Sequence, residues 1–124
     1  MGTIDSIILS DYILKHYGPM SHLKLQKLLF YCDAYYLAYF DKELIEDSFE
    51  AWVHGPISRK VYGSLKDKYM LYEELTYSNE TQKDVDKEFE KLTQDQQDFV
   101  ISILEELYTW TMFELEASIC NEKP

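Results

Sequence analysis

Cys32 is the residue of this 124-residue sequence best suited to nucleophilic chemistry, because a thiol beside a histidine can act as an activated nucleophile. Three histidines, His16, His22 and His54, are available as bases. Cys32, however, lies within an apolar run with helical spacing, where a thiol behaves as a small hydrophobic side chain. We therefore favour a buried structural role for Cys32 and predict no catalytic residue.

The sequence also lacks the patterns that are typical of metal and phosphate sites. A zinc site needs three or four cysteines and histidines at short, regular spacings, and here they are isolated. The chain contains no glycine-rich phosphate loop and no His-Glu-x-x-His pattern. The acidic pairs Glu73-Glu74 and Glu105-Glu106 are sequence neighbours, which do not face one another on a helix. We expect no metal and no cofactor, and a small enzyme is only a remote alternative.

Apolar residues recur at three- and four-residue steps through most of the chain, which indicates helices. The spacing and the helix-start and helix-stop residues predict helices over 3–17, 21–40, 58–69, 81–92, 93–108 and 112–119. The expected caps are Thr3, Ser21, Ser58, Thr93 with Gln96, and Thr111 with Glu114. Gly18-Pro19 should stop the first helix, with Gly18 in a left-handed conformation. The second helix is apolar on most faces and should therefore be central.

Residues 49–53 alternate in the manner of a strand and end at the turn His54-Gly55-Pro56. One short strand cannot stand alone, so it must lie against helices, pair with another short segment or await a partner chain. Residues 70–79 are predicted to be irregular. The expected fold is mainly α: a compact single-domain bundle of five or six helices, with one short extended segment near residues 48–54, over residues 1–124.

The charge is unevenly distributed. Residues 1–66 hold 8 acids and 7 bases, whereas residues 67–124 hold 15 acids and 5 bases, and the net charge is −11. This balance argues against direct binding to nucleic acid or to an anionic membrane. The acidic half is interpreted as a solvated face, as a surface that attracts a basic partner, or as a mimic of nucleic acid. Without a basic leader or a long apolar run, the chain is expected in the cytoplasm.

Two features of the second helix suggest recognition. Lys24 and Lys27 stand in its first two turns, where the helix dipole favours acids, so each either extends outward or meets an acid of a partner. Four tyrosines, among them Tyr31 and Tyr35, crowd the same helix. They are interpreted either as a core that reaches the domain edge or as a recognition surface, since tyrosine is enriched in binding hot spots.

Three runs resemble the Panacea domain of SocA-like antitoxins, a family also known from phage-associated proteins. They are Leu23–Tyr31 (LKLQKLLFY), Phe49–Ile57 (FEAWVHGPI) and Val61-Tyr62. The resemblance extends from about Ser21 to the C-terminus, and residues 3–17 match the family's first helix. It departs from the family pattern at His54, where a tyrosine is usual, and at residues 119–124, where the family's Thr-His segment is missing. A Panacea-like domain without the family's usual C-terminal end is therefore expected.

The resemblance implies an antitoxin that neutralises a cognate toxin, usually encoded nearby, by direct binding. One branch of the family delivers its toxin to an AAA+ protease, so a proteolytic adaptor, or a phage-encoded effector that redirects a host protein, is the main alternative. The predicted partner-binding residues are Lys24, Lys27, Tyr31, Tyr35, Trp52 and His54. The predicted structural motif residues are Leu25, Leu28, Gly55, Pro56 and Tyr62.

Overall fold

The computed structural model describes residues 2–53, 55–65, 71–79, 82–111 and 114–115. Its helices are α1 (Ser6–Tyr17), α2 (His22–Phe40), α3 (Arg59–Ser64), α4 (Val85–Phe89) and α5 (Gln94–Leu107). Its strands are β1 (Met20–Ser21), β2 (Phe49–Trp52), β3 (Gly55–Ser58) and β4 (Glu74–Leu75). The mainly α class predicted from the apolar spacing is confirmed. None of the described helices is long and apolar enough to cross a bilayer.

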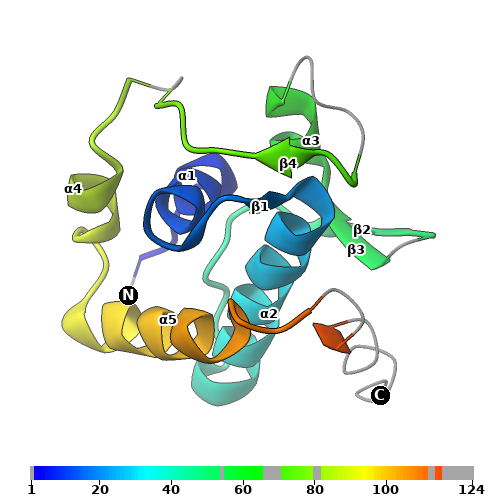
Figure 1. Ribbon diagram of the computed structural model, residues 1–124. Coiled ribbons are helices and arrows are strands. Elements are labelled where there is room, and N and C mark those ends of the chain that lie inside the picture. The colour runs from blue at the N-terminus through cyan, green and yellow to red at the C-terminus, as the bar shows by residue number, and fades with distance from the viewer. Residues whose placement is uncertain (1, 54, 66–70, 80–81, 112–113, 116–124) are drawn as a thin grey trace.

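Helix α2 runs through the middle of the fold (Figure 1) and contacts α1, α5, β1 and β3. The prediction of a central second helix is thus confirmed. Its apolar residues Leu25, Leu28, Leu29 and Cys32 are fully buried. Burying one such leucine stabilises the fold by roughly 1.5–3 kcal/mol, so α2 contributes a large part of the core.

Helix α1 begins at Asp5, whose carboxylate accepts a hydrogen bond from the Ile7 backbone N–H at 2.7 Å. The prediction that Thr3 caps this helix is wrong. The Ile4 backbone donates to the Leu44 carbonyl at 2.8 Å and bridges Ile45, so residues 3–4 are extended and the helix starts later. The Thr3 hydroxyl instead donates to Glu46 at 2.8 Å.

Gly18 ends α1 as predicted, but not in a left-handed conformation, since its φ is −79°. A Cβ atom built on Gly18 would lie 2.6 Å from the Leu14 carbonyl oxygen, so the close approach of the backbone selects glycine at this position. The following peptide bond to Pro19 is cis.

Strands β2 and β3 pair antiparallel, with Phe49 opposite Ser58 and Trp52 opposite Gly55. Of the three alternatives for the extended segment, pairing with a second short segment is therefore the one found. Pro56, predicted to lie in the turn that ends the segment, lies within β3, whereas Ser58 caps α3 as predicted. Helix α3 ends at Ser64, earlier than predicted, and residues 66–69 of that prediction lie outside the described residues.

Residues predicted to be irregular contain strand β4, which pairs with β1 at Met20–Leu75 and Ser21–Glu74. This pairing brings two carbonyls to the start of α2: the His22 N–H donates to Glu73 at 3.0 Å and the Leu23 N–H to Leu71 at 2.7 Å. The first N–H groups of a helix have no partner within it. The 71–75 segment thus completes the N-terminus of α2.

The last two complete helices differ in how well they were predicted. Helix α4 is shorter than residues 81–92, because Gln82 has a positive φ of 56° and Asp84 caps the helix by accepting from the Lys87 N–H. Helix α5 has the predicted capping box of Thr93 and Gln96. The Thr111 and Glu114 pair also exchanges both predicted hydrogen bonds. The rest of the predicted 112–119 helix lies outside the described residues.

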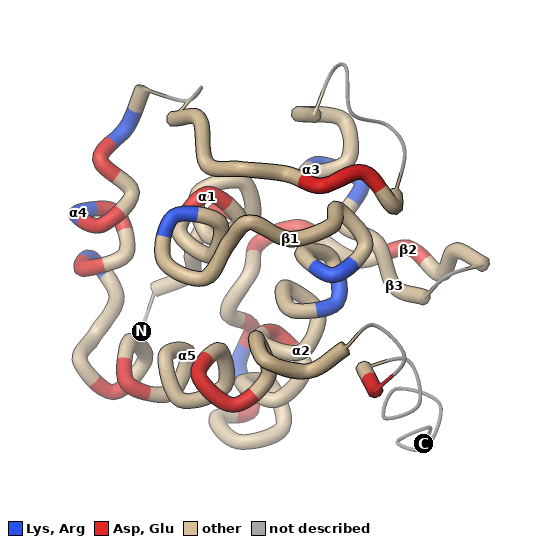
Figure 2. The backbone as a smooth tube through the Cα atoms, viewed as in Figure 1, with Lys and Arg blue, Asp and Glu red and all other residues tan. Residues whose placement is uncertain are grey.

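Among the described helices, α5 carries the largest excess of acidic over basic residues. This helix carries Asp95, Asp98, Glu105 and Glu106 and no lysine or arginine. Figure 2 shows this as red positions without a blue one along α5, whereas blue positions lie at the end of α1 and the start of α2. The surface of α5 therefore has a negative potential without local compensation.

Candidate functional site

The two longest motif runs meet where the first half of α2 packs against the β2–β3 hairpin. The Gln26 side chain, fully buried, accepts a hydrogen bond from the Ser58 N–H at 2.8 Å and donates one to the Ser58 carbonyl at 3.2 Å. The Gln26 amide thus pairs with both backbone groups of Ser58, as the backbone of a neighbouring strand would. Ser58 also caps α3 and donates to Asp47 at 2.7 Å. We call Gln26, Lys27, Gly55 and Ser58 the hairpin junction.

Lys27 lies beneath the hairpin with only 1 % of its surface exposed. A Cβ atom on Gly55 would be 3.0 Å from its ammonium nitrogen, and Gly55 itself has a φ of +117°. The two motif runs therefore require each other: the buried lysine occupies the space that any larger residue at 55 would take. Lys27, predicted as a partner-binding residue, is placed by the structure inside the fold.

Trp52 and Tyr62 join the hairpin to α3. Their ring centroids are 4.9 Å apart in an edge-to-face arrangement, and the Tyr62 ring stacks on His22 at 5.5 Å. The Trp52 indole N–H donates to Glu50 at 3.0 Å. Trp52 thus anchors the hairpin while remaining half-buried. His54, the other hairpin residue predicted to bind a partner, lies outside the described residues.

Lys24 contacts the C-terminal end of α5 rather than an acid. Its ammonium donates to the carbonyl of Tyr108, the C-cap of α5, at 2.5 Å. A cation is favourable at that end of a helix, where the last carbonyls have no partner within it. Partial burial lowers the pKa of the Lys24 side chain. The position of Lys24, which is unfavourable for the dipole of α2, is therefore explained by its contact with the end of α5.

Tyr31 is buried, with 1 % of its surface exposed, and its hydroxyl donates to the Leu115 carbonyl at 3.0 Å. Tyr35 stacks on Tyr31 at a centroid distance of 5.4 Å and is half-buried. Of the predicted partner-binding residues, Tyr35, Trp52 and Lys24 are therefore partly accessible, whereas Tyr31 and Lys27 are enclosed. Leu25 and Leu28 are fully buried, as their structural assignment implies.

An aromatic surface that was not predicted lies at the other end of α2. Tyr39 has 74 % of its surface exposed, and its ring centroid is 5.3 Å from Phe99 of α5 and 4.9 Å from Phe40. Tyr35 and Tyr39 are four residues apart and share one face of α2. The sequence showed the tyrosine spacing, but not that α5 would bring Phe99 beside it.

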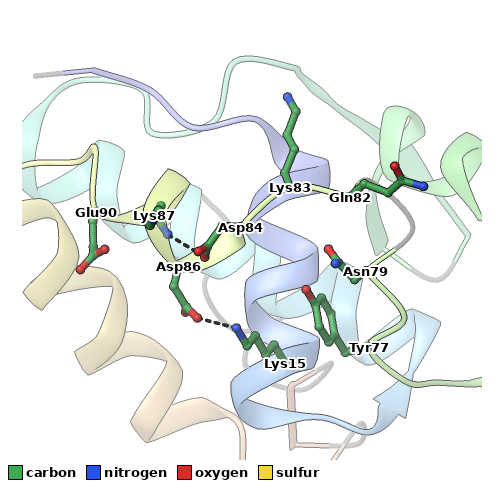
Figure 3. Close-up of a pocket in the computed structure, with 9 residues that line it drawn as sticks. All are labelled: Lys15, Tyr77, Asn79, Gln82, Lys83, Asp84, Asp86, Lys87 and Glu90. Atoms are coloured by element: carbon green, nitrogen blue, oxygen red, sulfur yellow. Dashed lines mark hydrogen bonds and ion pairs between the residues drawn. The ribbon is translucent and has the colours of Figure 1, made fainter.

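An open pocket of about 500 Å³ lies between the end of α1 and the segment leading into α4. It is lined by charges of both signs, including Lys15, Lys83, Asp86 and Glu90 (Figure 3). Lys15 and His16 both reach Asp86, at 2.5 Å each, so these charges hold α1 to α4. This arrangement joins two helices and does not assemble a nucleophile with its base.

The remaining chemical candidates give no reactive centre. Cys32 is fully buried, and desolvation together with the charge of Asp33 raises the pKa of its thiol, which disfavours the nucleophilic thiolate. Within the described ranges, no group of three or more His, Cys, Asp or Glu side chains is arranged to hold a metal ion.

The chain matches the family model described as "Antitoxin SocA-like, Panacea domain" over residues 25–124. The protein therefore belongs to the SocA-like antitoxin family with the Panacea domain. The match covers the hairpin junction as well as α5. No curated protein and no solved structure shows significant similarity to the chain. The family indicates an antitoxin-like role of a non-enzymatic kind, with a toxin as partner.

Proposed function

We propose that this protein neutralises a cognate toxin by direct, stoichiometric protein–protein binding, and that residues 1–124 form one helical bundle domain that does so in the cytoplasm. The observation that carries the proposal is the family match over residues 25–124. The burial of Cys32 and the pairing of the Lys15 ammonium with the Asp86 carboxylate support a binding role over a catalytic one.

The proposal is tested by co-expression with the product of the adjacent gene. We expect that product alone to arrest growth, and its co-expression with this protein to restore growth and give a complex that copurifies. A matched negative control is a variant that disrupts the hairpin junction, such as Gly55→Val. An adjacent gene product that is neither toxic nor bound would contradict the proposal.

The same experiment separates neutralisation from delivery to an AAA+ protease, the adaptor role of one family branch. A neutraliser leaves its toxin intact in a complex, in cells with or without the protease. An adaptor makes the toxin disappear only when the protease is present. We propose neutralisation, and immunoblotting of the toxin in protease-deficient and wild-type cells distinguishes the two roles.

A further inference from the structure

We propose that the toxin docks across α2 and α5 on a surface made of Tyr35, Tyr39, Phe99 and Ile103, and that it presents a basic amphipathic helix there. We call these four residues the aromatic strip. The inference rests on the proposed function and names the surface and the partner chemistry for it.

The aromatic strip combines exposure with a rigid base. Tyr39 is the most exposed tyrosine of the described residues, and its ring is held between Phe40 and Phe99, whose own centroids are 5.3 Å apart. Beneath them, Tyr36 is fully buried and packs edge-on against Phe99 at 5.9 Å. A large ring fixed before binding loses little conformational freedom when a partner covers it, and tyrosines of this kind dominate binding energies.

Acidic residues border the strip on α5. Asp95 and Glu106 are four residues before and seven residues after Phe99, so all three share one face of the helix. Both are exposed, and none of the described lysines or arginines pairs with them. A partner with lysine or arginine on each side of an apolar stripe would complement this face.

The opposite side of α5 is already occupied. The buried residues Val100 and Leu104 face the core. The accessible side of α5 is consequently the one that carries Phe99, Ile103 and Glu106.

A helix is the partner element that matches this geometry. The strip lies along two packed helices, and its acids are spaced by whole helical turns around Phe99. A helix with apolar residues at i, i+3, i+4 and i+7 can cover Tyr39 and Phe99 while its flanking basic residues reach Asp95 and Glu106. Nucleic acid is disfavoured on this face because its phosphates would meet the carboxylates of Asp95 and Glu106.

The test uses the full chain and the adjacent gene product as the probe, measured by isothermal titration calorimetry. Tyr39→Ala should weaken binding at least tenfold. The matched control is Tyr72→Ala, since Tyr72 is also exposed, at 66 %, but lies near β4 at the opposite end of α2. Circular dichroism and thermal unfolding of each variant establish that the fold is intact, and Tyr39→Lys provides a second variant at the same exposed position.

A separate double variant tests whether the acidic residues beside the aromatic strip contribute to binding. Asp95→Asn with Glu106→Gln should weaken binding and reduce its dependence on salt, whereas Glu90→Gln at the exposed C-cap of α4 should leave both unchanged. If the wild-type chain binds and the strip variants bind equally well, the docking surface is wrong and the proposed function stands. If the wild-type chain does not bind, the proposed function itself fails.

Two further outcomes would overturn the docking surface specifically. Loss of binding in Tyr72→Ala but not in Tyr39→Ala would place the toxin near β4. A wild-type chain that is dimeric by light scattering and becomes monomeric with Tyr39→Lys would assign the strip to a second copy of this chain.

Discussion

The side-chain amide of Gln26 binds both backbone groups of Ser58, accepting from its N–H at 2.8 Å and donating to its carbonyl at 3.2 Å. This contact joins α2 to β3 across 32 residues of sequence, entirely out of water. Because a buried backbone group without a partner is costly, Gln26 is a structural requirement of the hairpin. The family run that contains Gln26 therefore specifies the fold before it specifies a partner.

Gln26→Ala should lower the free energy of unfolding by about 3 kcal/mol, because it leaves two buried backbone groups of Ser58 unsatisfied. Urea unfolding followed by circular dichroism measures the loss. Gln94→Ala is the control, since Gln94 is exposed and bonds only to Asp98, so the change there should stay under about 0.5 kcal/mol. If Gln26→Ala lowers the free energy of unfolding no more than Gln94→Ala does, the hydrogen bonds of the hairpin junction contribute nothing to stability.

Gly55→Ala should destabilise the protein by about 2 kcal/mol, because φ +117° is strained for any residue with a side chain. The added Cβ would also stand 3.0 Å from the Lys27 ammonium. Gly63→Ala is a matched control: nothing lies within 4 Å of its Cβ position, and it should stabilise α3 by about 0.5–1 kcal/mol. A neutral Gly55→Ala in the same urea assay would contradict the geometry of the junction.

Local signals predicted the parts of the fold that depend on near neighbours. The caps at Ser21, Ser58 and Thr93 were predictable because each bonds within three residues of itself. The pairing of β1 with β4 was not, because two-residue strands leave no periodic pattern and join distant segments. Thr3 failed as a cap for the same reason, since a bridge from Ile4 to Ile45 extends the backbone there.

The kind of site, a recognition surface, could be predicted from the sequence better than its position on the fold could. Tyrosine spacing on α2 indicated a recognition surface, but burial decides which rings are accessible, and burial depends on where α5 and the 114–115 segment pack. Tyr31 is covered by Leu115, whereas Tyr39 beside Phe99 remains exposed. Lys24 and Lys27 occupy unfavourable helix positions; Lys24 meets a distant helix end, and Lys27 is buried beside the position of Gly55 in the hairpin.

Acid should weaken the start of α1 through Asp5. Burial alone would raise the pKa of this carboxyl, but Lys60 at 2.5 Å and the Ile7 N–H hold the pKa below its ordinary value of 3.8. A lowered folded pKa means that the ionised form stabilises the fold. That contribution is complete above about pH 4 and is lost as the pH falls through the folded pKa.

Asp5→Asn tests this expectation, because asparagine keeps a capping oxygen and loses the charge. The stability gap between wild type and variant, measured by urea unfolding, should be largest near neutral pH and shrink toward pH 3. Gly63→Ala, which removes no ionisable group, serves as the control and should differ from wild type by the same amount at every pH. A gap that stays constant or widens on acidification would contradict the assignment.

Cys32 should resist alkylation in the folded protein, since it is fully buried and burial raises the pKa of its thiol. Iodoacetamide labelling followed by peptide mass spectrometry should find Cys32 labelled only after unfolding in urea. Cys32→Ala should also leave toxin neutralisation unchanged in cells. Rapid labelling of the native chain, or loss of neutralisation in a folded Cys32→Ala variant, would indicate that Cys32 is a reactive group.

The central claim, that the protein acts by being bound to its toxin, is tested most directly by titrating purified protein into a fixed amount of the adjacent gene product while toxin activity is recorded. The account predicts that activity falls in proportion to the protein added, reaches zero at a fixed molar ratio and returns when the complex is dissociated. Complete and lasting inactivation by a small fraction of that ratio would demonstrate turnover and contradict the claim.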